Sequence, residues 1–269
     1  MRKRYWLIGT LLLVGSLAVY HHHWIATVKH YLASKEPVLN RAEVEEIVKD
    51  YLLQHPELLD QVLAKNRQQK AAAETDRIKK LEQAVDQHRK KIFADNPYGS
   101  IKLGNHAGKF RLLIFTQHPC SGCRKVEALL PELIKLYPDL EIELRFWPFL
   151  GENAIYPAKA VIAAQTQHAE QLLNNAFFVE SDPIDEDKLK SIVKRFPVIN
   201  EKALFKAMQN SKIERALAAN SNLAKTLHLD GTPFFLVANR DLSRISIILE
   251  YNQQFMQNIA IAINNLNPA

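Results

Sequence analysis

This chain has only two cysteines, Cys120 and Cys123, and their spacing suits redox chemistry. Two residues separate them, so the pattern is neither a disulfide framework nor a four-cysteine zinc site. A lone CxxC pair favours reversible thiol–disulfide exchange. The alternatives are a structural disulfide and one half of a metal site.

The segments around the cysteines predict how they are positioned. Residues 110–115 form an apolar run typical of a buried strand, and residues 120–137 have a helical pattern. Because the free N–H groups at a helix start favour thiolate over thiol, Cys120 is expected to be the exposed nucleophile with a depressed pKa. Cys123, one turn later, is expected to resolve the mixed disulfide.

Three neighbours are candidates for tuning this chemistry. The Ser121 hydroxyl is expected to offer the sulfur a hydrogen bond, and Gly122 to let a substrate backbone approach. His118, two residues before the nucleophile, either adds positive charge when protonated or lines the substrate groove.

A second motif, Gly231-Thr232-Pro233, opens the apolar strand predicted over residues 232–238. A cis peptide bond before Pro233 would turn the Thr232 backbone towards the cysteines, where it can pair with an extended substrate segment. The residues alone leave the cis and trans forms both open.

The remaining elements indicate an α/β thioredoxin-type core over residues 96–269, starting with a turn cluster at Asn96–Gly99. Further strands are predicted over 140–149 and 244–251, and a closing helix over 253–264. Only helical patterns occur between them, which predicts a helical insertion at about 153–227.

Residues 37–95 predict a helical extension with a joint near 54–57. Its first part carries apolar stripes, including Val44, Ile47 and Val48, that must be buried somewhere. A short heptad pattern from Ile78 to Ile92 predicts either self-association or a helix that folds back on its own domain.

Residues 1–36 predict export. A basic start and the uncharged run at 5–20 are typical of either a cleaved signal peptide or a retained inner-membrane anchor, of which we favour the anchor. His21, His22 and His23 follow, and with the cysteines they suggest metal handling as a further alternative. The formal charge of +6 is too diffuse to indicate a nucleic-acid partner, and no nucleic-acid motif occurs.

Together, Cys120-Ser-Gly-Cys123, Pro131, the helical insertion and Gly231-Thr-Pro233 resemble the DsbA-like thiol:disulfide oxidoreductases of the bacterial envelope, over residues 97–265. The extension is similar to that of a subgroup including ScsC and the Com outer-membrane proteins, in which such helices support oligomerisation.

The resemblance implies a periplasmic homo-oligomer that needs no cofactor or metal, with exported cysteine-containing proteins and a membrane redox partner as its partners. It also implies a cis Pro233, and that Thr232 and Pro233 hold the substrate.

One departure from this family concerns Ile114, six residues before Cys120, where a buried carboxylate is usual. Such an acid can pass the proton of the resolving thiol, so its absence is expected to slow release of the mixed disulfide. This departure motivates an alternative, a non-catalytic interaction protein of the envelope that keeps the fold as a binding platform.

Overall fold

The computed structural model describes residues 23–30, 39–249 and 251–266. The chain divides into two compact units, residues 1–71 and 72–269. Most of the predicted signal or anchor lies outside the described residues, and residues 23–30 form a short helix. No helix among the described residues is both long enough and apolar enough to cross a bilayer.

A five-stranded mixed sheet organises the second unit. Its spatial order is β1-β3-β2-β4-β5, with β2 parallel to β3 and every other pair antiparallel. This confirms the thioredoxin-type core, although β1 was not predicted because it is short and offers only two apolar residues. The strands are β1 (Ser100–Gly104), β2 (Phe110–Thr116), β3 (Leu140–Phe146), β4 (Phe234–Asn239) and β5 (Ile245–Ile248).

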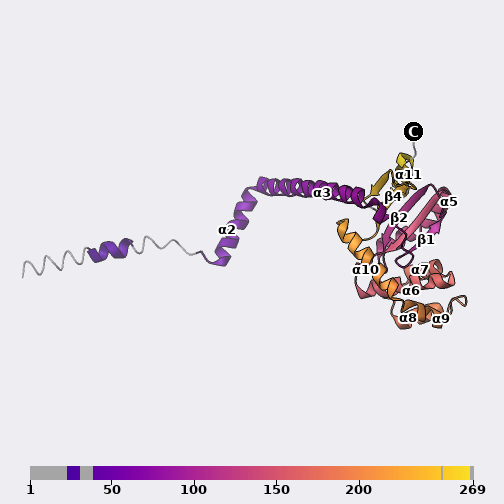
Figure 1. Ribbon diagram of the computed structural model, residues 1–269. Helices are drawn as coiled ribbons and strands as arrows, with labels where there is room; N and C mark the ends of the chain where they lie inside the picture. The colour runs from indigo at the N-terminus through magenta and orange to yellow at the C-terminus, as the bar shows by residue number, and fades with distance from the viewer. Residues whose placement is uncertain (1–22, 31–38, 250, 267–269) are drawn as a thin grey trace, which may run out of the picture. The chain divides into compact units, whose positions relative to one another are not determined.

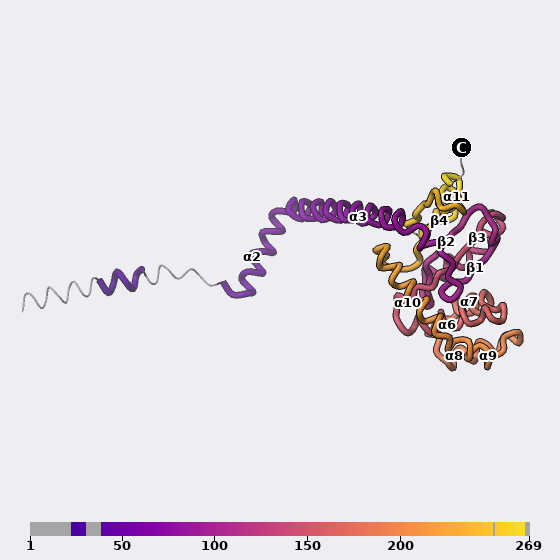
Figure 2. The backbone as a smooth tube through the Cα atoms, viewed as in Figure 1, coloured from indigo at the N-terminus to yellow at the C-terminus, as the bar shows by residue number. Residues whose placement is uncertain are grey.

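Helices surround this sheet. Those of the insertion, α6 to α9, gather to one side of it, away from α11 (Figures 1 and 2). The single helix predicted over 120–137 is two, because Pro131 lies at the start of the second and has no N–H for the helical ladder. The helices are α4 (Ser121–Glu127), α5 (Leu130–Leu136), α6 (Glu152–Ala164), a 3-10 turn (Gln165–Gln167), α7 (Glu170–Val179), α8 (Glu186–Val193), α9 (Glu201–Met208), α10 (Ser211–Thr226) and α11 (Phe255–Leu266).

The two faces of the sheet have separate cores, because successive side chains of a strand point to opposite faces. On β2, Leu112 and Ile114 join the larger core, which contains residues of α4 to α11. Leu113 and Phe115 join the smaller core with residues from the end of α10 and from the long helix before the sheet. The last part of that preceding helix is therefore part of the domain that carries the cysteines.

The extension comprises α2 (Arg41–Gln54) and α3 (Pro56–Ile92), which meet at His55, within the predicted joint. The heptad pattern at its end is buried by its own domain: Leu81, Val85 and Ile92 all belong to the smaller core. Self-association through this seam was therefore the wrong alternative. The composition change at Asn96 marks the start of strand-forming chain, whereas the compact unit already begins within α3.

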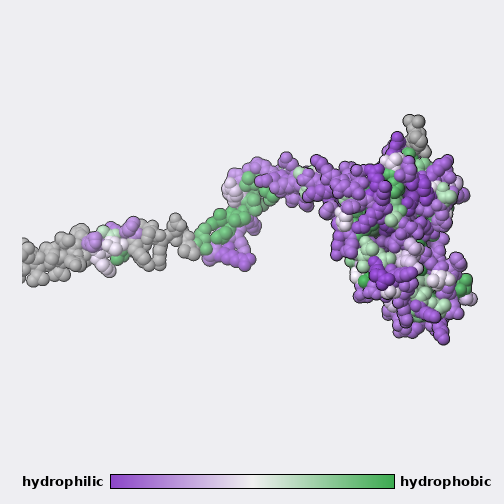
Figure 3. All heavy atoms as spheres, in the orientation of Figure 1, coloured by the Kyte–Doolittle hydropathy of each residue, from purple (hydrophilic) through white to green (hydrophobic). Residues whose placement is uncertain are grey.

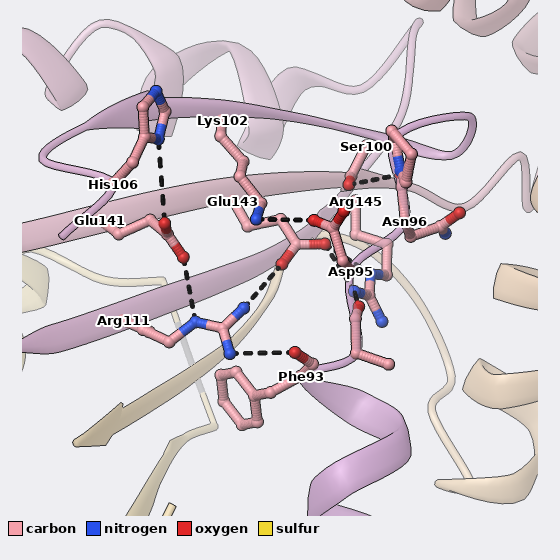
Figure 4. Close-up of polar contacts among 12 residues, drawn as sticks. Phe93, Asp95, Asn96, Ser100, Lys102, His106, Arg111, Glu141, Glu143 and Arg145 are labelled. Atoms are coloured by element: carbon pink, nitrogen blue, oxygen red, sulfur yellow. Dashed lines mark hydrogen bonds and ion pairs between the residues drawn. The ribbon is translucent and has the colours of Figure 1, made fainter. Parts of the chain in front are cut away.

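Two buried arginines hold the C-terminal end of α3 (Figure 4). Arg111 donates to the Phe93 carbonyl at 2.9 Å, and Arg145 donates to the carbonyls of residues 92 and 94 at 2.6 and 2.9 Å. Glu141 and Glu143 in turn pair with the two guanidinium groups. The arrangement satisfies carbonyls that a helix end leaves without partners, and it places positive charge at the negative end of the helix dipole.

Candidate functional site

The cysteine pair follows β2 and opens α4, as predicted, with Cys120 just before the helix and Cys123 in its first turn. Cys120 and Cys123 form a disulfide with their Cα atoms 5.2 Å apart. Cys120 is the half-buried N-cap of α4, and its Sγ accepts the backbone N–H of Cys123 at 3.1 Å. Cys123 is fully buried. The sulfur that is accessible from the surface is therefore that of Cys120.

The segment before β4 faces this sulfur. The Thr232–Pro233 bond is cis, as the resemblance implied. The Thr232 hydroxyl donates to Cys120 Sγ across 3.6 Å, and the Thr232 carbonyl oxygen also lies 3.6 Å from Sγ. A Cβ atom on Gly122 would lie 2.9 Å from Pro233 Cδ. Glycine at 122 is thus required for this internal packing, a reason that differs from the substrate approach predicted for it.

Gln117 is a polar residue of the site that the sequence reasoning missed. Its side chain is buried, donates from Nε2 to Thr232 Oγ1 at 3.0 Å and accepts from the Leu150 backbone N–H at Oε1, also at 3.0 Å. The only signal in the sequence was an amide directly after a buried strand and three residues before the nucleophile.

His118 is buried among the aromatic rings of Phe146, Phe177 and Phe178. Burial lowers the pKa of its imidazole to about 3, so the ring is neutral at pH 7. The predicted charge effect on Cys120 is therefore absent, and the ring instead lines a small hollow beside Cys120 that Arg124 and Glu180 also line. The His118–Pro119 bond is also cis, which the sequence did not predict.

Ser121 is exposed on the first turn of α4. The hydrogen bonds found among the described residues include none from its hydroxyl to the Cys120 sulfur, so that prediction does not hold in the disulfide state. The backbone N–H of Cys123 and the Thr232 hydroxyl contact the sulfur instead.

Residues 95–248, more than half of the chain, match the family described as Thioredoxin. The chain belongs to the thioredoxin family. Residues 40–73 of this thioredoxin-family chain match the Copper resistance protein ScsC N-terminal domain, which confirms the predicted combination of an ScsC-like extension and a thioredoxin-like domain. No curated protein sequence matches the chain significantly.

Solved structures show the same fold. A thioredoxin-like oxidoreductase from Silicibacter pomeroyi DSS-3 is 24% identical, with a TM-score of 0.58 over 67% of this chain and 99% of its own. BcfH from Salmonella enterica Typhimurium is 24% identical, with a TM-score of 0.58 over 87% and 98%. The catalytic domain of Proteus mirabilis ScsC is 20% identical, with a TM-score of 0.57 over 68% and 97%.

A partly buried carboxyl occurs in this thioredoxin-family chain at an unpredicted place. Ile114 lies in the larger apolar core, as the sequence implied. Glu127, one turn after Cys123 on α4, accepts a hydrogen bond from Asn174 Nδ2 at 2.8 Å. Desolvation by burial raises the pKa of Glu127 to about 7. The signal missed in the sequence was a Glu four residues after Cys123, which places both on one face of the helix.

Metal ligands do not cluster in the part of the chain that the structure describes: no group of three or more His, Cys, Asp or Glu side chains is close enough to hold an ion. His21 and His22 of the predicted metal-handling alternative lie outside the described residues.

Proposed function

We propose that this protein is a thiol:disulfide oxidoreductase of the bacterial envelope that acts on exported cysteine-containing proteins. The observation that carries the proposal is the environment of Cys120 Sγ. A half-buried sulfur accepts one backbone N–H and one hydroxyl hydrogen, while the carbonyl of Thr232 lies beside it for an extended substrate. Similarity to ScsC and DsbA-like structures supports the same class of chemistry.

The proposed thiol–disulfide exchange proceeds in two steps. In the reduced protein, the Cys120 thiolate attacks one sulfur of a substrate disulfide, and the other substrate sulfur leaves as a thiolate. The Cys123 thiol then loses its proton and attacks Cys120 Sγ, which releases the first substrate sulfur as a thiolate and closes the Cys120–Cys123 disulfide. The substrate gains two electrons and the pair loses them. The reverse sequence oxidises a substrate dithiol.

Glu127 is the proton acceptor we propose for the second step. It lies on the same face of α4 as the buried Cys123, and a carboxyl with a pKa of about 7 can both accept and return a proton near neutral pH. This assigns to α4 the task that a carboxylate at position 114 would otherwise perform.

The proposal includes self-association of the chain through its helical extension. In α2 and the start of α3, apolar side chains are largely exposed and gather in one green band (Figure 3). We name these residues the extension stripe and expect a second copy of the chain to cover it, as the match to the ScsC N-terminal domain supports. The stripe consists of Val44, Ile47, Val48, Tyr51, Leu53, Leu59, Val62 and Leu63.

The N-terminal segment indicates where the protein is located, and the residue before the cis proline indicates the redox direction of the reaction. The basic start and the uncharged run that follows support retention in the inner membrane, with the cysteines in the periplasm, where a membrane redox partner resets them. Threonine before the cis proline and self-association favour isomerisation or reduction over oxidation.

The test is the redox equilibrium of the full-length protein against glutathione, with a Cys120→Ser variant as the control. We expect exchange in the wild type and none in the control. A potential far above the roughly −270 mV of thioredoxin assigns oxidation or isomerisation, and one near it assigns reduction. A wild-type pair that fails to exchange refutes the proposal and makes the non-catalytic binding platform the better one.

A further inference from the structure

We propose that Gln117 is a positioning residue that directs the Thr232 hydroxyl hydrogen onto Cys120 Sγ and thereby stabilises the Cys120 thiolate. This inference rests on the proposed function, because it concerns the reactivity of the same sulfur. It joins three contacts into one ordered chain: Leu150 N–H to Gln117 Oε1, Gln117 Nε2 to Thr232 Oγ1, and Thr232 Oγ1 to Cys120 Sγ.

The direction of this chain follows from its first member. A backbone N–H only donates, so the side-chain atom of Gln117 that faces Leu150 must be the amide oxygen. The amide nitrogen therefore faces Thr232 at 3.0 Å and can only donate to it. With its oxygen serving as acceptor, the Thr232 hydroxyl keeps its own hydrogen for another partner. The sulfur of Cys120 lies 3.6 Å from that oxygen, within the range of a hydrogen bond to sulfur.

Burial fixes the amide in this orientation. Gln117 is 3% exposed, so water does not compete for its two polar atoms. Leu150, which anchors the amide oxygen, follows Pro148 and the exposed Phe149 in the loop after β3. The loop therefore sets the orientation of the amide, and the amide sets that of the hydroxyl.

The chemical consequence concerns the charged form of the sulfur. A thiolate is a stronger hydrogen-bond acceptor than a thiol or a disulfide sulfur, so a directed O–H stabilises the reduced, ionised state most. It lowers the pKa of Cys120, improves Cys120 as a leaving group and makes the pair more oxidising.

The test measures the pKa of Cys120 from thiolate absorbance near 240 nm against pH, in reduced full-length protein with Cys123→Ala in every sample. We expect Gln117→Leu to raise that pKa by roughly 0.5 to 1 unit, the size of one weakened hydrogen bond. Gln117→Glu should raise it further, because a carboxylate accepts the Thr232 hydroxyl hydrogen and adds negative charge. That nearly isosteric variant also keeps an acceptor for Leu150, which protects the test against misfolding.

A double-mutant cycle separates positioning from general loss of structure. Thr232→Val alone should raise the pKa of Cys120 about as much as Gln117→Leu, and Thr232→Ser should restore it. In the Thr232→Val background, Gln117→Leu should change nothing further. An unchanged pKa in Gln117→Leu, or an equal shift with and without the Thr232 hydroxyl, overturns the proposal.

This readout needs no substrate, so it is independent of the proposed enzymatic function. If the wild-type pair fails to exchange with glutathione while the cycle gives the expected shifts, the proposed function falls and the role of Gln117 stands. If the wild type exchanges and the cycle shows no shifts, the role of Gln117 falls and the proposed function stands.

Discussion

The two halves of α3 carry similar apolar stripes, and only one of them is covered. In the first half, Leu59, Val62 and Leu63 are 50%, 63% and 50% exposed. In the second half, Leu81, Val85 and Ile92 are 1%, 4% and 0% exposed, because one face of the sheet packs against them. The same helical periodicity therefore occurs in an exposed stripe and in a buried one. The periodicity alone does not tell what covers each stripe.

A continuous helix therefore need not be a single structural element. The second half of α3 belongs to the compact unit that starts at residue 72, and the first half belongs to the unit before it. Substitutions in the two halves test this division, because they should change the free energy of unfolding of residues 72–269 by different amounts.

The largest effect is expected at the end of the buried half. Arg145→Met removes the donor to the carbonyls of residues 92 and 94 and takes from the buried Glu143 the nearer of its two guanidinium partners, which leaves only Arg111 at 3.4 Å. We expect a loss of about 4 kcal/mol in urea unfolding, as for other broken buried ion pairs. Arg77→Met is the control, because its pair with Glu74 is at the surface and should cost at most about 1 kcal/mol. Equal losses would show that the contacts of Arg145 with the end of α3 do not stabilise the domain.

A matched pair of leucine-to-alanine substitutions compares the covered and the exposed stripe directly. Leu81→Ala opens a cavity in the smaller core and should cost about 3 kcal/mol. Leu63→Ala removes the same atoms from an exposed position and should leave the unfolding of the domain within about 0.5 kcal/mol of the wild type. A large loss in the second variant contradicts the division of α3.

The pH dependence of stability should come from the cysteine-bearing unit. Because the native pKa of Glu127 is about 7 and its ordinary value is 4.5, the unfolded state loses this proton first as pH rises. Stability should fall between pH 4.5 and 7 and level off above that range. Glu127→Gln should remove this fall and be more stable than the wild type by roughly 2 kcal/mol at pH 8, with little difference at pH 4. Parallel stability curves for the two proteins would contradict the raised pKa.

The smallest effect on domain stability is expected in the extension stripe, where the change should be in assembly. Val48→Glu places a charge in the exposed apolar stripe, and sedimentation equilibrium should show a monomer while domain unfolding shifts by less than about 0.5 kcal/mol. Glu46→Gln, an exposed neighbour outside the stripe, is the control and should keep the wild-type mass. Unchanged mass in both variants would remove the extension stripe as the assembly surface.

Much of the fold was predictable because its signals are local. The strand before Cys120, the CxxC pair at a helix start and the helices between 153 and 227 each follow from apolar periodicity or from a motif. The break at Pro131 and strand β1 were missed: the first depends on a single residue inside a helical pattern, and the second on pairing with β3.

The site was predictable in its cysteines and less so in what surrounds them. The charge of His118 depends on three aromatic rings from distant segments, and the environment of Glu127 depends on Asn174 from α7. The partners of Gln117 come from loops that are far apart in the sequence. Such properties arise from tertiary contacts, which single-sequence patterns do not contain.

The packing of the C-terminal end of α3 against the sheet limits where related proteins can exchange their extensions. An exchange of extensions between related proteins at the composition boundary near residue 96 would replace Leu81, Val85, Ile92 and Phe93, which pack against one face of the sheet, with side chains fitted to a different sheet. Viable recombination points should therefore lie near residue 71, inside the helix, so that each cysteine-bearing domain keeps the last turns of its own α3.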